Sequence, residues 1–146
     1  MPHFVTVVVL SLALAATLAE AKAQHIHVTA QVVQQTFTGD FANPQLGDQL
    51  ITSVVLLNEE AEEVGTGTGA CSIVSVPPLA PRLQCLLTAT FASGQIIFGG
   101  AAPLPQAGAV AHFGIVGGTD DFRKAGGEAI LTVLSPTLQD AVFDLD

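Results

Sequence analysis

Tyrosine and tryptophan are both absent from the 146 residues, and only four residues are lysine or arginine, against thirteen aspartates and glutamates. The formal net charge of −9 excludes a basic surface of the kind that holds nucleic acid or anionic lipid headgroups. Charged residues make up 12% of the chain and hydrophobic residues 49%, a balance that argues against disorder. The sequence therefore predicts a folded domain with no nucleic-acid partner.

Helical patterning is also scarce, because no segment after residue 23 combines an amphipathic period with capping residues. Fourteen glycines and eight prolines instead fit a turn-rich, all-β protein. A two-residue hairpin turn is predicted at Ser93-Gly94. Apolar and β-branched runs between turn signals predict eight strands, at residues 25–37, 49–57, 64–76, 82–92, 95–100, 109–116, 128–134 and 138–145.

Eight short strands joined mostly by hairpins must protect the edges of their sheet, and closure into a barrel removes the edges altogether. We therefore expect a single eight-stranded antiparallel β-barrel, with a β-sandwich as the alternative. Several strands, such as "SVVLL" and "AILTVL", are apolar on both faces. This favours a partly apolar lumen together with an outer face that packs against further copies, as a dimer or trimer.

The one long apolar run, Phe4–Ala19, precedes Ala21-Lys22-Ala23, which matches the small-x-small rule for signal peptidase. The sequence predicts that residues 1–23 form a signal peptide and that residues 24–146 form a secreted domain, free of the membrane after cleavage. Few charges precede the apolar run, so an uncleaved membrane anchor remains the alternative.

Only two cysteines occur, Cys71 and Cys85. In an exported chain, a lone pair is most simply a disulfide, with two buried free thiols as the alternative. The pair has no C-x-x-C spacing, which disfavours a redox role or a metal role.

The stretch "GTGTGA", residues 65–70, formally satisfies the glycine pattern of dinucleotide-binding proteins. That pattern requires an apolar strand before it and a helix N-terminus after it, so that free amides meet the pyrophosphate. Here an acidic run precedes the glycines and the β-branched "CSIVSV" follows. We therefore predict no nucleotide cofactor.

The segments "LQCLLTATFASGQIIFGG" and "FGIVGGTDDFRKAGGEAIL" resemble the allene oxide cyclase and dirigent protein superfamily, over residues from 25 to the C-terminus. The resemblance implies an oligomeric eight-stranded barrel whose hydrophobic lumen holds substrates in a cyclising or stereoselective conformation without an organic cofactor. Family members often carry Arg where this chain has Gly126, so no role is assigned to that position. The most specific motif consists of Gly117, Gly118, Thr119, Phe122, Ala125 and Gly127.

Few side chains carry recognisable chemistry. His112 lies in the apolar "AVAHFGIV", where an imidazole facing a lumen would transfer protons, although a structural histidine is the alternative. Asp121 and Glu128 are candidate acids at strand ends, unless they are ordinary surface carboxylates. His25 and His27 share one face of a strand, as metal ligands do, but their position beside the N-terminus leads us to predict no metal site.

Aromatic lumen walls would have to come from phenylalanine, because the tyrosines that often orient phenolic substrates in this superfamily are absent. This absence weakens the case for lignan-type dirigent activity. Packing within the core is the alternative fate of these phenylalanines. The candidates for ligand contact are Phe37, Phe91, Phe98 and Phe113.

Three functions remain open at this stage. The domain steers cyclisation, isomerisation or stereoselective coupling of a small hydrophobic molecule such as a lipid or phenolic, or it carries such a molecule unchanged, or it is an interaction module with a packed lumen. The volume of the lumen separates the third hypothesis from the other two, because a substrate-sized site needs about a few hundred Å³. No catalytic triad is needed for the first, since confinement in a near-attack conformation supplies much of the barrier reduction.

Overall fold

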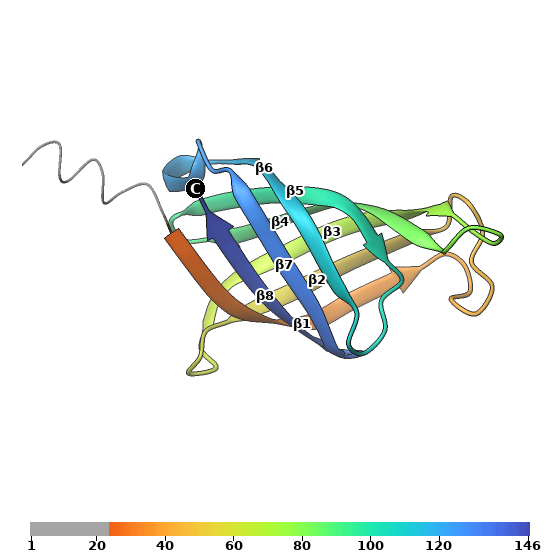
Figure 1. Ribbon diagram of the computed structural model, residues 1–146. Coiled ribbons are helices and arrows are strands. Elements are labelled where there is room, and N and C mark those ends of the chain that lie inside the picture. The colour runs from red at the N-terminus through yellow and green to blue at the C-terminus, as the bar shows by residue number, and fades with distance from the viewer. Residues whose placement is uncertain (1–23) are drawn as a thin grey trace, which may run out of the picture.

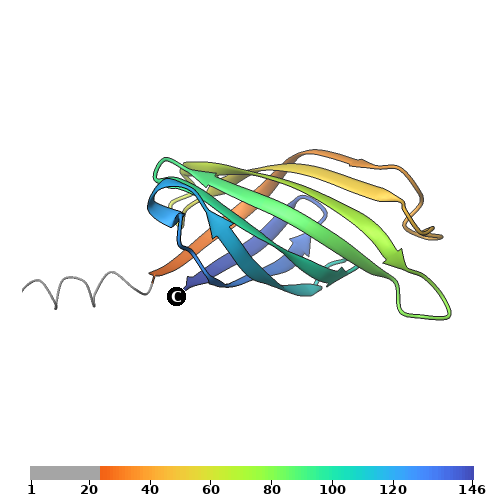
Figure 2. The same ribbon diagram turned by 90° about the horizontal axis from the view of Figure 1, so that it is seen from above.

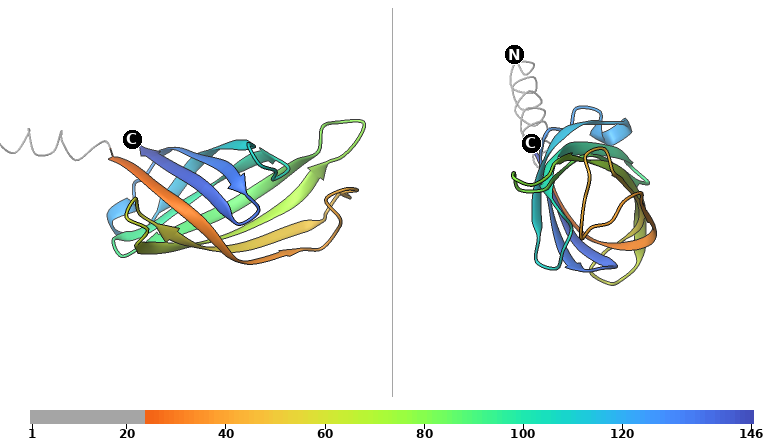
Figure 3. Two further views of the ribbon diagram at one scale, coloured as in Figure 1. Left: turned by 90° about the horizontal axis from the view of Figure 1, so that it is seen from below. Right: turned by 90° about the vertical axis from the view of Figure 1, so that its right-hand side faces the viewer.

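The computed structural model describes residues 24–146, which form one closed antiparallel barrel in which each strand pairs with its neighbours in sequence and β8 pairs with β1 (Figure 1). A view along the barrel shows the strands as a complete ring (Figure 3). The predicted barrel is confirmed, and the sandwich is excluded. The strands are β1 (Gln24–Phe37), β2 (Gln49–Leu57), β3 (Glu63–Ser75), β4 (Arg82–Phe91), β5 (Gly94–Pro103), β6 (Val110–Gly118), β7 (Gly127–Ser135) and β8 (Leu138–Leu145).

The predicted bounds of β2 and β8 match the structure residue for residue. The expected turn at Ser93-Gly94 is displaced by one residue, because Gly94 already pairs with Phe91 and leaves Ala92 and Ser93 as the turn. β5 is longer than predicted, since Ala101–Pro103 continues to pair with β4. The predicted signal peptide lies outside the described residues.

Alternate residues of each strand face the interior, where large and small side chains complement one another. The inward positions of β3 include Gly67 and Gly69, which alternate with the outward-facing Thr66 and Thr68. A Cβ added at Gly67 would lie 2.7 Å from the Val54 side chain, and one added at Gly69 would lie 2.7 Å from the Leu87 side chain. The glycines of "GTGTGA" therefore admit the bulkier side chains of β2 and β4 into the lumen, which explains the motif without a nucleotide.

One end of the barrel is closed by the segment that connects β6 to β7. It contains the short 3₁₀-helix η1 (Asp120–Phe122), whose Phe122 is buried and packs 6.2 Å from Phe91, ring centre to ring centre. A Cβ on Gly118 would clash with the carbonyl oxygens of Gln95 and Phe122, so only glycine allows this close approach. The described chain begins and ends at this same end of the barrel (Figure 2).

The opposite end, which we call the loop end, carries the connections 38–48, 76–81, 104–109 and 136–137. Here the ladder between β5 and β6 stops early, because only Ile96–Gly99 of β5 pairs with β6. The connections 38–48 and 76–81 project beyond the rest of the barrel at this end (Figure 1). Within residues 24–146, no helix is long and apolar enough to span a membrane.

Candidate functional site

A cavity of about 120 Å³ occupies the lumen between the aromatic layer and the loop end. Phe98, Phe113 and Phe143 form its inner wall, and Pro105 and Val133 border it at the loop end. Leu131 faces the interior and is only half-buried, because the cavity leaves part of its side chain uncovered. The cavity is smaller than the roughly 300–1,000 Å³ of common ligand pockets, so the criterion of a few hundred Å³ set from the sequence for a substrate-sized site is not met. It approaches the roughly 150 Å³ at which an apolar protein cavity holds benzene, so it encloses one ring-sized group.

The wall of this cavity is almost wholly apolar, and none of its lining residues carries a charge or an imidazole. Thr52 and Gln139 are the polar residues whose positions in β2 and β8 alternate with inward-facing apolar side chains. Both lie toward the loop end, because Thr52 is the fourth residue of β2 and Gln139 the second of β8. Sequence reasoning missed both.

A signal for Gln139 was present in "LQDAVFDL", because Asp140 and Asp144 must face solvent. Alternation then assigns Gln139, Ala141 and Phe143 to the interior, as the structure shows. Thr52 offered no comparable signal, because its strand, "QLITSVVLL", is apolar on both faces.

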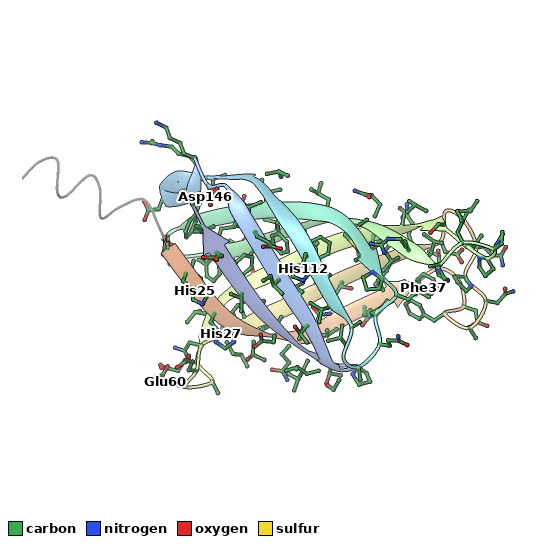
Figure 4. The ribbon with its side chains drawn as sticks, viewed as in Figure 1. His25, His27, Phe37, Glu60, His112 and Asp146 are labelled. Atoms are coloured by element: carbon green, nitrogen blue, oxygen red, sulfur yellow. A yellow bond between two sulfur atoms is a disulfide. The ribbon has the colours of Figure 1, made fainter. Side chains whose placement is uncertain are left out.

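The four predicted phenylalanines lie in three different environments. Phe98 and Phe113 line the cavity, with ring centres 5.9 Å apart. Phe91 lies deeper and packs against Phe122 and Phe143 at the closed end. Phe37 lies at the far end of β1, where it stacks on Phe41 at 3.9 Å and packs against the edge of the core without lining the cavity (Figure 4).

The predicted acids and bases lie on the outside of the barrel. The His112 side chain is 62% exposed, and its Nδ1 lies 2.6 Å from Glu128 Oε1 on the neighbouring strand. Asp121 is exposed in η1, at the closed end. His112 faces outward because Phe113 and Ile115 take the buried positions of β6. The imidazole of His112 therefore points away from the lumen, which agrees with the alternative of a structural histidine, and the geometry lends no support to a catalytic role for the three residues.

The remaining described histidines also pair with carboxylates on the outer wall (Figure 4). His25 lies 3.8 Å from Asp144, and His27 Nε2 lies 2.6 Å from Asp140 Oδ1. The hydrogen bond to the Asp140 carboxylate raises the pKa of His27, because it favours the imidazolium form. No group of three or more metal-ligating side chains gathers anywhere in residues 24–146.

The predicted disulfide is confirmed. Cys71 of β3 and Cys85 of β4 are directly paired across the ladder, with an S–S bond of 2.06 Å. Both cysteines face inward, are buried, and line the cavity. The bond therefore ties together the two strands that carry one wall of the site.

The sequence also matches a known protein family over almost the whole described chain. The model of the allene oxide cyclase barrel-like domain matches residues 25–143. The chain belongs to this family. A search of curated protein sequences finds no match to this chain.

Solved structures share the fold of this allene oxide cyclase-like barrel. A pyocyanin demethylase is 25% identical, with a TM-score of 0.69 over 83% of this chain and 99% of that one. The exo-specific intermolecular Diels-Alderase AbnU is 19% identical, with a TM-score of 0.69 over 84% and 98% of the two chains. The Diels-Alderase AbmU from Streptomyces koyangensis is 18% identical, with a TM-score of 0.73 over 93% of this chain and 71% of that one.

Proposed function

We propose that the barrel binds a small hydrophobic molecule in its lumen and steers its cyclisation, isomerisation or stereoselective coupling. The observation that carries this proposal is the uncharged, apolar cavity of about 120 Å³ inside the closed barrel. Packing of the lumen as a mere structural core would leave no such volume, since protein interiors contain few voids larger than a water molecule.

The cavity supplies shape rather than acid–base chemistry, because no titratable side chain lines it. Holding a flexible molecule in a near-attack conformation accelerates an intramolecular reaction without a nucleophile. Two structures of the same fold are Diels-Alderases, which supports a ring-forming reaction within such a barrel. A carrier that releases its ligand unchanged is the second candidate, because the same cavity serves it equally well.

Blocking the lumen tests the proposal. Ala111 lines the cavity from β6, so the larger side chain of Ala111→Phe should fill it. When the variant is produced in the organism that makes the protein and is then purified, it should no longer retain the natural ligand. Native mass spectrometry reports the bound mass, and Gln31→Phe places the same ring on the exposed face of β1 as the control. Equal retention by the two variants would place the ligand outside the lumen and contradict the proposal.

The compound released from the wild-type protein separates the enzyme from the carrier. Cyclisation and isomerisation leave the mass unchanged, so the released compound must be identified by NMR or chromatography after incubation of its precursor with the protein. Formation of the rearranged product by the wild-type barrel and not by Ala111→Phe supports the steering function. Recovery of unchanged precursor from both proteins supports the carrier.

We also propose that the domain acts after export, with cleavage before Gln24. The apolar leader supports this, and so does the disulfide, because disulfides persist in oxidising compartments. The small-molecule function requires no nucleic-acid or membrane partner.

Self-association is a further part of the proposal. The strands β2 to β6 contain a single acidic residue, Glu63, although the whole chain has a net charge of −9. Leu86 and Val116 on the outer face of this region are 60% and 68% exposed. A second copy fits here best, because this wall avoids repulsion between carboxylates and offers apolar surface to bury.

Substitution of Leu86 with glutamate should convert the oligomer to monomer, because a charge would be buried without a partner at the interface. Light scattering coupled to size-exclusion chromatography measures the mass of the assembly. Leu134→Glu is the control, because Leu134 is 52% exposed on β7, outside the acid-poor wall. An unchanged oligomer for Leu86→Glu, or an equal loss in the control, would place the interface elsewhere.

A further inference from the structure

The polarity of the lumen restricts the ligand more narrowly than its volume does. Every charged side chain in residues 24–146 lies outside the cavity. An anionic ligand would lose its hydration there without gaining a cation, and an uncompensated buried charge is strongly unfavourable. The net charge of −9 adds repulsion on approach.

The loop end offers an anion no compensation. Arg82, the basic residue at this end, is exposed at the start of β4, and its position alternates with the inward-facing Leu83. Asp40 and Asp48 in the 38–48 connection accept hydrogen bonds from the backbone amides of Ala42 and Gln45, each at 2.9 Å. In the connections of this end and at the start of β4, the charged side chains are therefore two carboxylates and one cation that faces away from the lumen.

Gln139 is the polar side chain best suited to meet a ligand here. It is half-buried, borders the cavity, and lies opposite Ala30 of β1 and Val133 of β7 in the strand ladders. Among the hydrogen bonds within residues 24–146, none involves its side-chain amide. That amide carries two donors and one acceptor, so it can receive a carbonyl oxygen or a hydroxyl group.

We infer that the barrel selects neutral molecules that combine a ring-sized apolar group with one carbonyl or hydroxyl oxygen, and that Gln139 anchors this oxygen. The inference rests on the proposed use of the lumen for binding, and it names the class of ligand and the residue that orients it. The apolar group lies against Phe98, Phe113 and Phe143, while the oxygen points toward the loop end. Thr52, on β2, lines another part of the wall and serves as the competing anchor.

Three probes of similar size separate the contributions of the apolar ring, the neutral polar group and the negative charge to binding. Toluene, benzyl alcohol and benzoate share one aromatic ring and differ in bearing no polar group, a neutral hydroxyl group or a carboxylate. Titrations followed by amide NMR shifts should show benzyl alcohol binding about fivefold more tightly than toluene, the effect of one net hydrogen bond, with no binding of benzoate in the lumen. Tight binding of benzoate would overturn the selection for neutral ligands.

The anchor is tested by Gln139→Leu, which should reduce benzyl alcohol to the affinity of toluene and leave toluene unchanged. Gln31→Leu, on the exposed face of β1, is the matched control and should preserve the preference. Retention of the preference in Gln139→Leu, together with its loss in Thr52→Val, would overturn the assignment to Gln139. Failure of toluene itself to bind, or its unaltered binding to Ala111→Phe, would instead contradict the proposed function, so the two failures are distinguishable.

Discussion

Replacement of Phe143 with alanine is expected to lower the free energy of unfolding by about 3–5 kcal/mol, the range for a buried phenylalanine. Phe143 is 1% exposed, and its ring lies 5.2 Å from that of Phe98 and 6.3 Å from that of Phe91, in edge-on contacts. It thus joins the wall of the cavity to the aromatic plug at the closed end. Denaturation by urea, followed by a two-state fit, measures the loss.

Phe37→Ala is the matched control, because Phe37 loses the same number of atoms but is only half-buried and stacks on an exposed Phe41. We expect Phe37→Ala to lower the free energy of unfolding by less than half as much as Phe143→Ala, because a half-buried ring removes less apolar surface from water when the chain folds. Equal losses in the two variants would show that the aromatic layer is not the centre of the core.

The Phe143→Ala variant should also recover part of its lost stability when toluene is present. Removal of the ring extends the existing cavity toward Phe91, and an apolar guest that binds only the folded state stabilises it by mass action. A rise in the urea midpoint with toluene concentration, larger for Phe143→Ala than for the wild type, is the expected result. No difference between them would indicate that the lumen collapses around the missing ring.

The fold could be predicted well from the sequence because turn-forming residues clearly separate its strands. Gly, Pro and Asn clusters separate the strands, and β2 and β8 were bounded correctly because turns flank them closely. The end of β5 was missed because Ala101–Pro103 continues the ladder with β4 alone, and the turn signals of the preceding glycines and of proline argue against a strand there.

The site was harder to predict because a shift of one residue reverses the face of every side chain. In "AVAHFGIV" both faces are apolar, so the sequence could not decide whether His112 or Phe113 points inward. The structure decides through contacts that are remote in sequence, since Phe113 packs against Phe98 of β5 and lines the cavity. The disulfide was predictable because it required only the number of cysteines and the expectation of export.

Removal of the disulfide is the second change from which we expect a large loss in the free energy of unfolding. Cys71 and Cys85 are 14 residues apart, and a closed loop of this length contributes about 3 kcal/mol in the chain-entropy model by restricting the unfolded chain. The double variant Cys71→Ala with Cys85→Ala should therefore unfold at lower urea concentration by about this free energy. Reduction of the wild-type protein should give a similar loss.

The comparison between the two treatments isolates the bond from the packing of the side chains. Both cysteines are buried against the lumen, so the alanines add a small loss of apolar contact that reduction does not cause. Reductant should leave the double variant unchanged while it destabilises the wild type. If reductant leaves the urea curve of the wild type in place, the bond contributes nothing to folding, and the pairing of β3 with β4 alone holds this wall of the cavity together.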